Sequence, residues 1–325
     1  MKITFLGTSG GKPSRDRNLS AIALSYDQKP DWYLIDCGEA TQHQLMRSDL
    51  KLGKLSKIFI THLHGDHCYG LPGLLSTRVM EEIRTPLTVY GPNGIKEYLE
   101  AVKQYTKSSL LDNTQIIEIQ NEGEIIEFDT FKLQALPLDH SVTSYAYCFF
   151  ENDISGNIDT KALETIGLKP SKLYGEIKKG KNITLPNGQK IEAQKYLLDP
   201  IKGRNIIIAG DNCNPELITK HIKNIDLLIH EATYTQEIFD NLKKKVKHTT
   251  AKALGQAAQN GDVKNLIATH ISPRYTKNPD KSKKDIAILD KELKDHFKGN
   301  CFIANDFDTF IFDKKTLKIK KYSKS

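Results

Sequence analysis

Long apolar runs are missing from this sequence. None of its hydrophobic stretches approaches the ~20 residues that a membrane-spanning helix requires, which excludes an integral membrane protein. The N-terminal segment MKITFLGTSG contains an apolar stretch too short for a signal-peptide core, and it is typical of a strand that runs into a glycine turn. We therefore expect a cytoplasmic protein with no membrane partner.

Cysteine is scarce as well. The five cysteines lie far apart and form no CxxC pair, which argues against both a disulfide framework and a thiolate zinc site. What the chain has instead is a formal net charge of +7, which attracts anions and is compatible with nucleic acid without specifying it.

Short runs rich in Ile, Val and Leu alternate with helical patterns, for example Asn205–Ala209 before Pro215–Ile222. This alternation indicates an α/β fold. The opening runs are separated by turn residues and look like antiparallel strands, so the sheets are predicted to be mixed. These runs are Lys2–Leu6, Leu19–Tyr26 and Trp32–Asp36.

One stretch, Asp153–Gly203, breaks the alternation. It contains turn signals such as Gly167–Pro170 and Pro186–Gly188 and has little core-forming periodicity. Ten basic residues against four acidic ones lie within Lys161–Arg204, close to the excess positive charge of the whole chain. We interpret the stretch as a flexible basic arm inserted into a single domain that spans residues 1–325. The alternative is a solvated surface loop whose lysines serve solubility.

The strongest chemical signal is the segment THLHGDH at Thr61–His67, which follows the strand-like Lys57–Ile60. Zinc favours imidazole nitrogen and carboxylate oxygen, and a tight loop at the carboxyl end of a strand can direct such side chains into one cavity. The first two histidines alternate by two, as neighbours on an extended segment do, while the adjacent Asp66 and His67 diverge enough to serve a second ion. The economical interpretation is a pair of metal ions.

Further candidate ligands follow later strand-like runs. They are His140 after Phe131–Leu138, Asp211 after Asn205–Ala209, and His270 after Leu266–Thr269. A single His or Asp at a strand end more often caps a turn, but the repeated order of strand and then ligand indicates one shared site. His230 and His248 occupy similar positions.

These motifs resemble the metallo-β-lactamase superfamily, whose signature is HxHxDH and whose later ligands follow in the order His, Asp, His. The resemblance implies a four-layered αβ/βα sandwich with mixed sheets and with the metals at one edge. It also implies that Asp36, in the segment LIDCG, contacts a metal ligand and orients it without binding the metal itself.

More selective segments resemble ribonuclease Z, the tRNA 3′-processing endonuclease family, in its short form. They are Phe5–Asn18, Cys68–Leu75, the HEAT motif His230–Thr233, and His270–Tyr275. Two departures stand out. Thr249 occupies a position where the family usually has Ser, which keeps the hydroxyl, and Asn212 replaces a common Thr, which leaves the hydrogen bonding next to Asp211 open.

The resemblance implies a zinc-dependent endoribonuclease that removes the 3′ trailer of precursor tRNA and leaves a 3′-hydroxyl. One ion would be held by His62, His64 and His140, and the other by Asp66, His67 and His270, with Asp211 bridging both. Manganese or iron is compatible with the same ligands.

Four residues receive roles in the reaction. Asp66 would accept the proton of water, and His248 would donate a proton to the leaving 3′-oxygen while Glu231 orients its ring. Arg274 is a candidate for holding the scissile phosphate. The alternative for His248 and Glu231 is that they brace the wall of the pocket.

In this family the arm between the ligands equivalent to His140 and Asp211 carries the tRNA-binding surface, and homodimers are usual. Lysines on such an arm can pair with phosphates without reading the sequence. Two other functions stay open: a small-molecule ester, thioester or cyclic nucleotide hydrolase of the same superfamily, and a non-catalytic RNA-binding protein that keeps the metal for stability.

Overall fold

A computed structural model describes residues 1–27, 29–120, 123–154, 156–279 and 283–322. The chain divides into two compact units, Met1–Phe150 with Arg204–Ser325, and Glu151–Gly203. We call the first unit the body and the second the arm. Within the described residues, no helix combines the length and the hydropathy needed to cross a membrane.

The first sheet of the body has eight strands in the order β19-β18-β1-β2-β3-β4-β5-β6. Pairing is antiparallel from β19 to β3 and parallel from β3 to β6. In that order the strands are Ile319–Tyr322, Thr309–Phe312, Lys2–Gly7, Ala21–Ser25, Trp32–Ile35, Leu55–Phe59, Leu87–Gly91 and Thr114–Glu118.

The second sheet has seven strands in the order β17-β14-β13-β12-β9-β8-β7. The strands β12, β13, β14 and β17 run parallel, whereas β9 pairs with β12 in the antiparallel direction. In the order of the sheet the strands are Asn300–Ile303, Asn265–Thr269, Leu227–Glu231, Asn205–Ala209, Ser144–Glu151, Phe131–Leu138 and Ile125–Glu127. The prediction of an α/β fold with mixed sheets is confirmed.

The two sheets pack face to face. Phe5 and Phe59 of the first sheet share one buried cluster with Phe131, Phe149 and Ile206 of the second. Because side chains alternate along a strand, the opposite face of each sheet needs its own cover. In β12, for example, Ile206 and Ile208 join the cluster between the sheets, whereas Ile207 belongs to a cluster on the other side.

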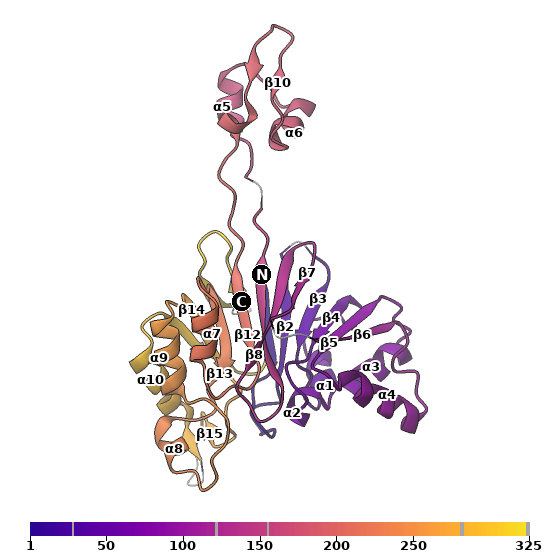
Figure 1. Cartoon of the computed structure of the whole chain (residues 1–325), viewed down its shortest axis with the longest axis vertical. Coiled ribbons are helices and arrows are strands. Elements are labelled where there is room, and N and C mark those ends of the chain that lie inside the picture. Colours follow the sequence, from indigo (N-terminus) through magenta and orange to yellow (C-terminus); the bar gives the residue numbers. More distant parts are fainter. Residues whose placement is uncertain (28, 121–122, 155, 280–282, 323–325) are drawn as a thin grey trace. The chain divides into compact units, whose positions relative to one another are not determined.

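Helices supply that cover on the outer faces (Figure 1). Helices α1 (Thr41–Met46), α3 (Leu71–Met80) and α4 (Ile95–Thr106) bury leucines and isoleucines against the first sheet. Helices α7 (Glu216–His221), α9 (Ala251–Asn260) and α10 (Ile286–His296) do the same for the second sheet. The result is the four-layered αβ/βα sandwich expected from the sequence.

The arm has a small apolar cluster of its own. Its elements are α5 (Thr160–Thr165), α6 (Lys172–Lys178), β10 (Ile183–Thr184), β11 (Lys190–Ile191) and the 3-10 turn Ala193–Tyr196. Leu163, Ile177 and Ile191 are buried in this cluster. Of the stretch interpreted as the arm, residue 155 lies outside the described residues.

The arm carries less excess charge than the count within Lys161–Arg204 suggests. Glu151–Gly203 contains nine lysines and seven acidic residues. Arg204 belongs to the body, where its guanidinium is 1% exposed and donates a hydrogen bond to the carbonyl oxygen of Phe312 at 2.5 Å. Any attraction of the arm for anions must therefore come from how its lysines are distributed.

Candidate metal centre

The ligand segment after β4 divides into an extended part and a short helix. His62 and His64 lie in the extended part, and Asp66 and His67 lie in helix α2 (Gly65–Cys68). The sequence predicted one tight loop for all four side chains. The helical turn explains their divergence, because successive residues of a helix point about 100° apart.

All seven candidate ligands come together, in two groups. The first contains His62, His64, His140 and Asp211, and the second contains Asp66, His67 and His270; within each group the donor atoms lie within 4.8 Å of one another. The first four of these residues in chain order follow strands of the first sheet, and the other three follow strands of the second sheet.

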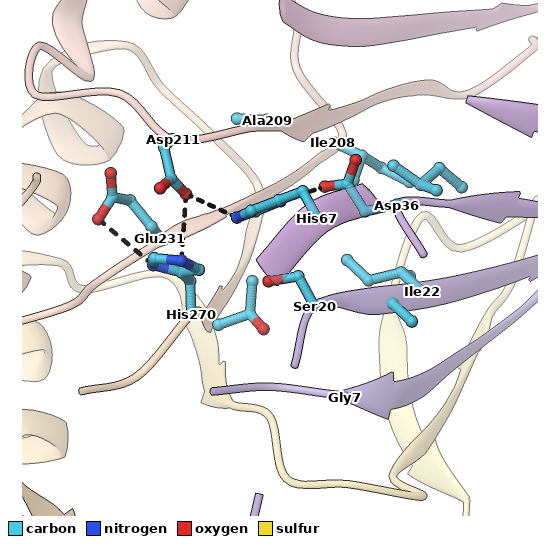
Figure 2. A pocket seen from close by; sticks show the side chains of 13 residues that line it. Gly7, Ser20, Ile22, Asp36, His67, Ile208, Ala209, Asp211, Glu231 and His270 are labelled. Carbon is cyan, nitrogen blue, oxygen red and sulfur yellow. Dashed lines mark hydrogen bonds and ion pairs between the residues drawn. The ribbon is translucent and has the colours of Figure 1, made fainter. Parts of the chain in front are cut away.

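Asp211 lies between the two groups, and Figure 2 shows its carboxylate beside His67 and His270 of the second group. Its Oδ2 is 3.7 Å from His62 Nε2 and 3.8 Å from His140 Nε2, whereas its Oδ1 is 3.4 Å from His67 Nε2 and 3.3 Å from His270 Nε2. One carboxylate therefore presents a separate oxygen to each group, as a bridging ligand would.

The cluster fits a divalent cation. Three of its buried atoms, His62 Nε2, His67 Nε2 and Asp211 Oδ1, have no hydrogen-bond partner within the described parts of the chain. Buried polar atoms normally have partners, so three such atoms facing one another indicate a missing partner of positive charge. Imidazole nitrogens and carboxylate oxygens are the donors that zinc and related ions prefer.

The carboxylates are held in their ionised form. Burial by itself would raise the pKa of Asp211, but the nearby His270 and His67 lower that pKa well below its usual value. Burial opposes ionisation of Asp66 too, and the hydrogen bond and charge of His270 and His67 outweigh it. Both side chains are thus charged acceptors at neutral pH.

Asp36 follows β3 and holds both the ligand segment and one ligand. Its Oδ1 accepts a hydrogen bond from the Thr61 amide at 2.7 Å, and its Oδ2 lies 2.7 Å from Nδ1 of His67. This contact leaves Nε2 of His67 directed at Asp211 (Figure 2). Asp36 and His270 adopt φ angles of 59° and 55°, a left-handed backbone that non-glycine residues seldom show outside constrained positions.

His248 and Glu231 form a pair beside the cluster. Nδ1 of His248 is 3.1 Å from Oε2 of Glu231 and 3.6 Å from Oδ2 of Asp211. Burial alone would lower the pKa of His248, but the carboxylates of Glu231 and Asp211 outweigh it and raise the pKa to about 9. His248 also forms a third possible metal-binding group, with Asp211 and His270.

Arg274 is less closely tied to the cluster. Its guanidinium lies over the ring of Tyr234 at 5.8 Å, and the residue is exposed. Arg274 and Tyr234 line a pocket that also includes Gly10 and Gly11. In the sequence, His230 has a position after a strand similar to that of the candidate ligands, but His230 belongs to neither ligand group. Its side chain is fully buried, and its Nε2 lies 3.0 Å from Nδ2 of Asn212.

Three residues near the cluster received no role from the sequence. The Thr233 hydroxyl lies 3.0 Å from Nδ1 of His270 and donates a short hydrogen bond to Glu231. The Asn212 amide donates to Oε1 of Glu231 at 2.8 Å, and the carbonyl oxygen of Lys247 lies 2.9 Å from Nδ1 of His140. Thr233 lies within the HEAT motif and Asn212 follows a ligand, so proximity in sequence was the available signal for both. Lys247 contributes a backbone atom, which no residue type reveals.

Comparisons with known proteins agree with the geometry. A protein-family model described as the anti-Pycsar protein Apyc1 matches residues 1–167. The ribonuclease Z of Marinobacter nauticus is 37% identical over 314 residues, covering 97% of this chain and 97% of that protein.

Solved structures give the same picture. The human tRNase Z, short form, aligns with a TM-score of 0.64 and 27% identity, covering 95% of this chain and 98% of that one. The metallo-β-lactamase fold protein YhfI from Bacillus subtilis aligns with a TM-score of 0.65 over 95% of this chain and 98% of its own, and at 18% identity it speaks for the fold alone. The sequence resemblance is confirmed: the chain has the metallo-β-lactamase fold and belongs to the ribonuclease Z family.

Proposed function

We propose that the protein is a metal-dependent endoribonuclease that removes the 3′ trailer from precursor tRNA and leaves a 3′-hydroxyl on the tRNA. The observation that carries the proposal is the position of Asp211, whose two oxygens face two separate groups of ligands. Membership in the ribonuclease Z family favours this function over hydrolysis of a small ester, thioester or cyclic nucleotide.

The cofactor would be two zinc ions per subunit. His62, His64 and His140 would hold one ion, and Asp66, His67 and His270 the other, with Asp211 bridging. The mixture of imidazole and carboxylate donors supports zinc, and manganese or iron is compatible with the same donors. Two divalent cations bound there would lower the pKa of water and stabilise the attacking and departing oxygens of an in-line displacement.

The protein's own residues would then move the protons. Asp66 would accept the proton of the attacking water, which is consistent with its ionised state. His248 would donate a proton to the departing 3′-oxygen, since Glu231 occupies its Nδ1 and leaves Nε2 as the proton-carrying atom. Arg274 would hold a phosphate oxygen, because its guanidinium offers paired donors in a pocket whose glycines, Gly10 and Gly11, adjoin His270 and Asp66.

The arm would supply the tRNA-binding surface. Lys161, Lys169, Lys172 and Lys190 are exposed and form no ion pair with any described residue, whereas Lys179, Lys181, Lys195 and Lys202 pair with acidic neighbours. Unpaired lysines are the ones that can neutralise phosphates without first giving up a partner.

We also propose a cytoplasmic homodimer. The five cysteines are all free, as is usual in a reducing compartment, which supports the cytoplasmic location.

The dimer is supported by exposed apolar side chains. Met46 at the end of α1 and Met80 at the end of α3 are each 82% exposed, and large exposed apolar side chains often mark a contact surface. Light scattering of the purified protein would give the mass, and a monomer at micromolar concentration would contradict the dimer.

The decisive experiment is to incubate the metal-loaded protein with a labelled precursor tRNA and to map both product ends. We expect one cut, a tRNA with a 3′-hydroxyl, a trailer with a 5′-phosphate, and loss of cleavage when a chelator is added. Hydrolysis of bis(p-nitrophenyl) phosphate without cleavage of the precursor would support the small-molecule hydrolase. Binding of the RNA with no cleavage of either substrate would support the non-catalytic alternative.

A further inference from the structure

The pocket lined by Arg274, Tyr234, Gly10 and Gly11 is a cavity that adjoins the candidate metal centre. It has a volume of about 460 Å³, which falls within the range of pockets for single small molecules. Its lining includes Gly11, Lys12, Tyr234, Ser272, Arg274 and Lys283.

The glycine turn after β1 connects this cavity with the cluster. The Gly11 amide donates a hydrogen bond to Oδ2 of Asp66 at 2.8 Å. A Cβ atom at Gly10 would lie 2.6 Å from the ring of His270, so only glycine allows the turn to approach so closely. At Gly11 the backbone has a φ of 74° and a Cβ atom would meet open space, which keeps this wall of the cavity free.

The opposite wall is aromatic. The ring of Tyr234 lies 6.3 Å from that of His248, between centroids, so this wall of the cavity lies near the proposed proton donor. Together with the guanidinium of Arg274 over the ring, the wall offers planar groups on which a nucleobase can stack.

The charge of the cavity complements a nucleotide. Lys12, Arg274 and Lys283 contribute three cations, and none of the described residues that line the cavity is acidic. Phosphate alone would need only the cations, and an apolar ligand would need only the ring. A ligand that combines an anion with a flat heterocycle uses both.

We propose that this cavity holds one ribonucleotide next to the scissile phosphate, with its base against Tyr234 and a phosphate near Lys12 and Arg274. The proposal rests on the proposed function, because it assigns the cavity to the RNA that the metal centre would cut. It adds a contact with a base to contacts with the RNA backbone, and makes Tyr234 a residue for substrate binding.

Calorimetry of the metal-loaded protein tests the proposal with three ligands: uridine 5′-monophosphate, uridine 3′-monophosphate and methyl phosphate. We expect at least one mononucleotide to bind about tenfold more tightly than methyl phosphate, the gain that one stacked base typically provides. Preference for the 5′-phosphate assigns the cavity to the trailer side of the cut, and preference for the 3′-phosphate assigns it to the tRNA side. Equal affinity for all three ligands would overturn the proposal.

Variants at Tyr234 identify the surface that contacts the base. Tyr234→Leu should remove the advantage of the nucleotide, and Tyr234→Phe, which keeps the ring, should retain it. Tyr105→Leu is the matched control, since Tyr105 is 83% exposed at the end of α4 and lies outside the lining of the cavity. An advantage that survives Tyr234→Leu contradicts the assignment.

Saturation-transfer NMR on the unmodified protein gives an independent measurement if Tyr234→Leu does not fold. We expect the H5 and H6 protons of the uracil to receive more saturation than the ribose protons, and the reverse order would overturn the proposal.

These experiments distinguish failure of the nucleotide cavity from failure of the proposed function. Base-dependent binding without cleavage of precursor tRNA removes only the proposed function, and tRNA cleavage without base-dependent binding removes only the nucleotide cavity.

Discussion

Several imidazoles of the cluster are held at one nitrogen by a neighbouring group. The Thr61 hydroxyl lies 3.0 Å from Nδ1 of His62, and Asp36, Lys247 and Thr233 contact Nδ1 of His67, His140 and His270. Such contacts fix the tautomer of a histidine and the direction of its other nitrogen. The affinity for a cation therefore depends on residues that would never touch it.

Asp36→Asn tests this dependence. The substitution removes the charged acceptor at Nδ1 of His67 and disturbs the hydrogen bond from the Thr61 amide. We expect the affinity for zinc, measured by competition with a chromogenic chelator, to fall by roughly 10- to 100-fold. Asp112→Asn, at an exposed position, is the control. Unchanged affinity in Asp36→Asn would mean that its carboxylate only holds the backbone.

His248→Ala tests the proposed proton donor. Because His248 is placed in neither of the groups that would hold the two ions, the variant should keep both metals by elemental analysis. Its turnover of precursor tRNA should fall by roughly 10²- to 10⁴-fold, the range for loss of general acid catalysis.

The control for this variant is His221→Ala, an exposed histidine at the end of α7. Near wild-type cleavage by His248→Ala would remove the residue from the mechanism. Loss of one metal would instead identify His248 as a ligand in the third group, with Asp211 and His270.

At the scale of elements, the strands that carry ligands were predictable. Phe131–Leu138 and Asn205–Ala209 were predicted with the bounds of β8 and β12. The run of β12 is buried on both faces, whereas β8 alternates buried residues with Lys132 and Gln134. Parallel strands end at one edge of a sheet, so residues after β12 and β14 must lie close together. Local patterns were sufficient there.

Other elements depend on pairing between distant segments. Strand β18 pairs with β1 across the whole chain, and Asp306 just before it accepts hydrogen bonds from Thr8 and the Asn18 amide. No local pattern encodes such a register. The contact of Thr233 with His270 likewise exists only because β13 and β14 are neighbours in the sheet.

Removal of the arm is a prediction at this scale. Phe150 of β9 pairs with Asn205 of β12 in the antiparallel direction, so a short glycine-rich turn in place of residues 153–203 would close a hairpin. We expect processing of precursor tRNA to fall by on the order of 100-fold, because several phosphate contacts would be lost. Hydrolysis of bis(p-nitrophenyl) phosphate should persist, and equal loss of both activities would argue against a dedicated RNA arm.

Lysine variants refine this test without removing the arm. Replacing the four lysines without ion pairs, Lys161, Lys169, Lys172 and Lys190, by Ala should weaken tRNA binding and reduce its dependence on salt concentration. The matched control replaces four lysines that already pair with acidic neighbours, Lys179, Lys181, Lys195 and Lys202. A larger loss in the control set would show that the distribution of unpaired charge does not determine binding.

At the scale of the whole body, the metal centre joins the two sheets. Ligands that follow the first sheet face ligands that follow the second, and two carboxylates lie among them, with Asp211 buried and Asp66 half-buried. Without a cation these carboxylates repel each other, so a bound ion stabilises the folded body relative to the unfolded chain.

Metal removal should therefore lower the melting temperature. With zinc at about a thousand times its dissociation constant, chelation should reduce Tm by roughly 5 to 15 °C, since each kcal/mol corresponds to a few degrees in a protein of this size. Differential scanning calorimetry before and after chelation, with the metal content measured in parallel, checks this value. Added zinc should restore the original Tm, and an unchanged Tm after complete metal loss would show that the ions contribute nothing to folding.

The order of these parts along the chain has a consequence for synthesis. The last candidate ligand is residue 270, and β18, which flanks β1, begins only at Thr309. While the ribosome still holds these segments, the growing polypeptide has neither a full set of donors nor a finished first sheet. Such a nascent chain would be inactive toward transfer RNA until the segment that contains β18 has left the ribosome.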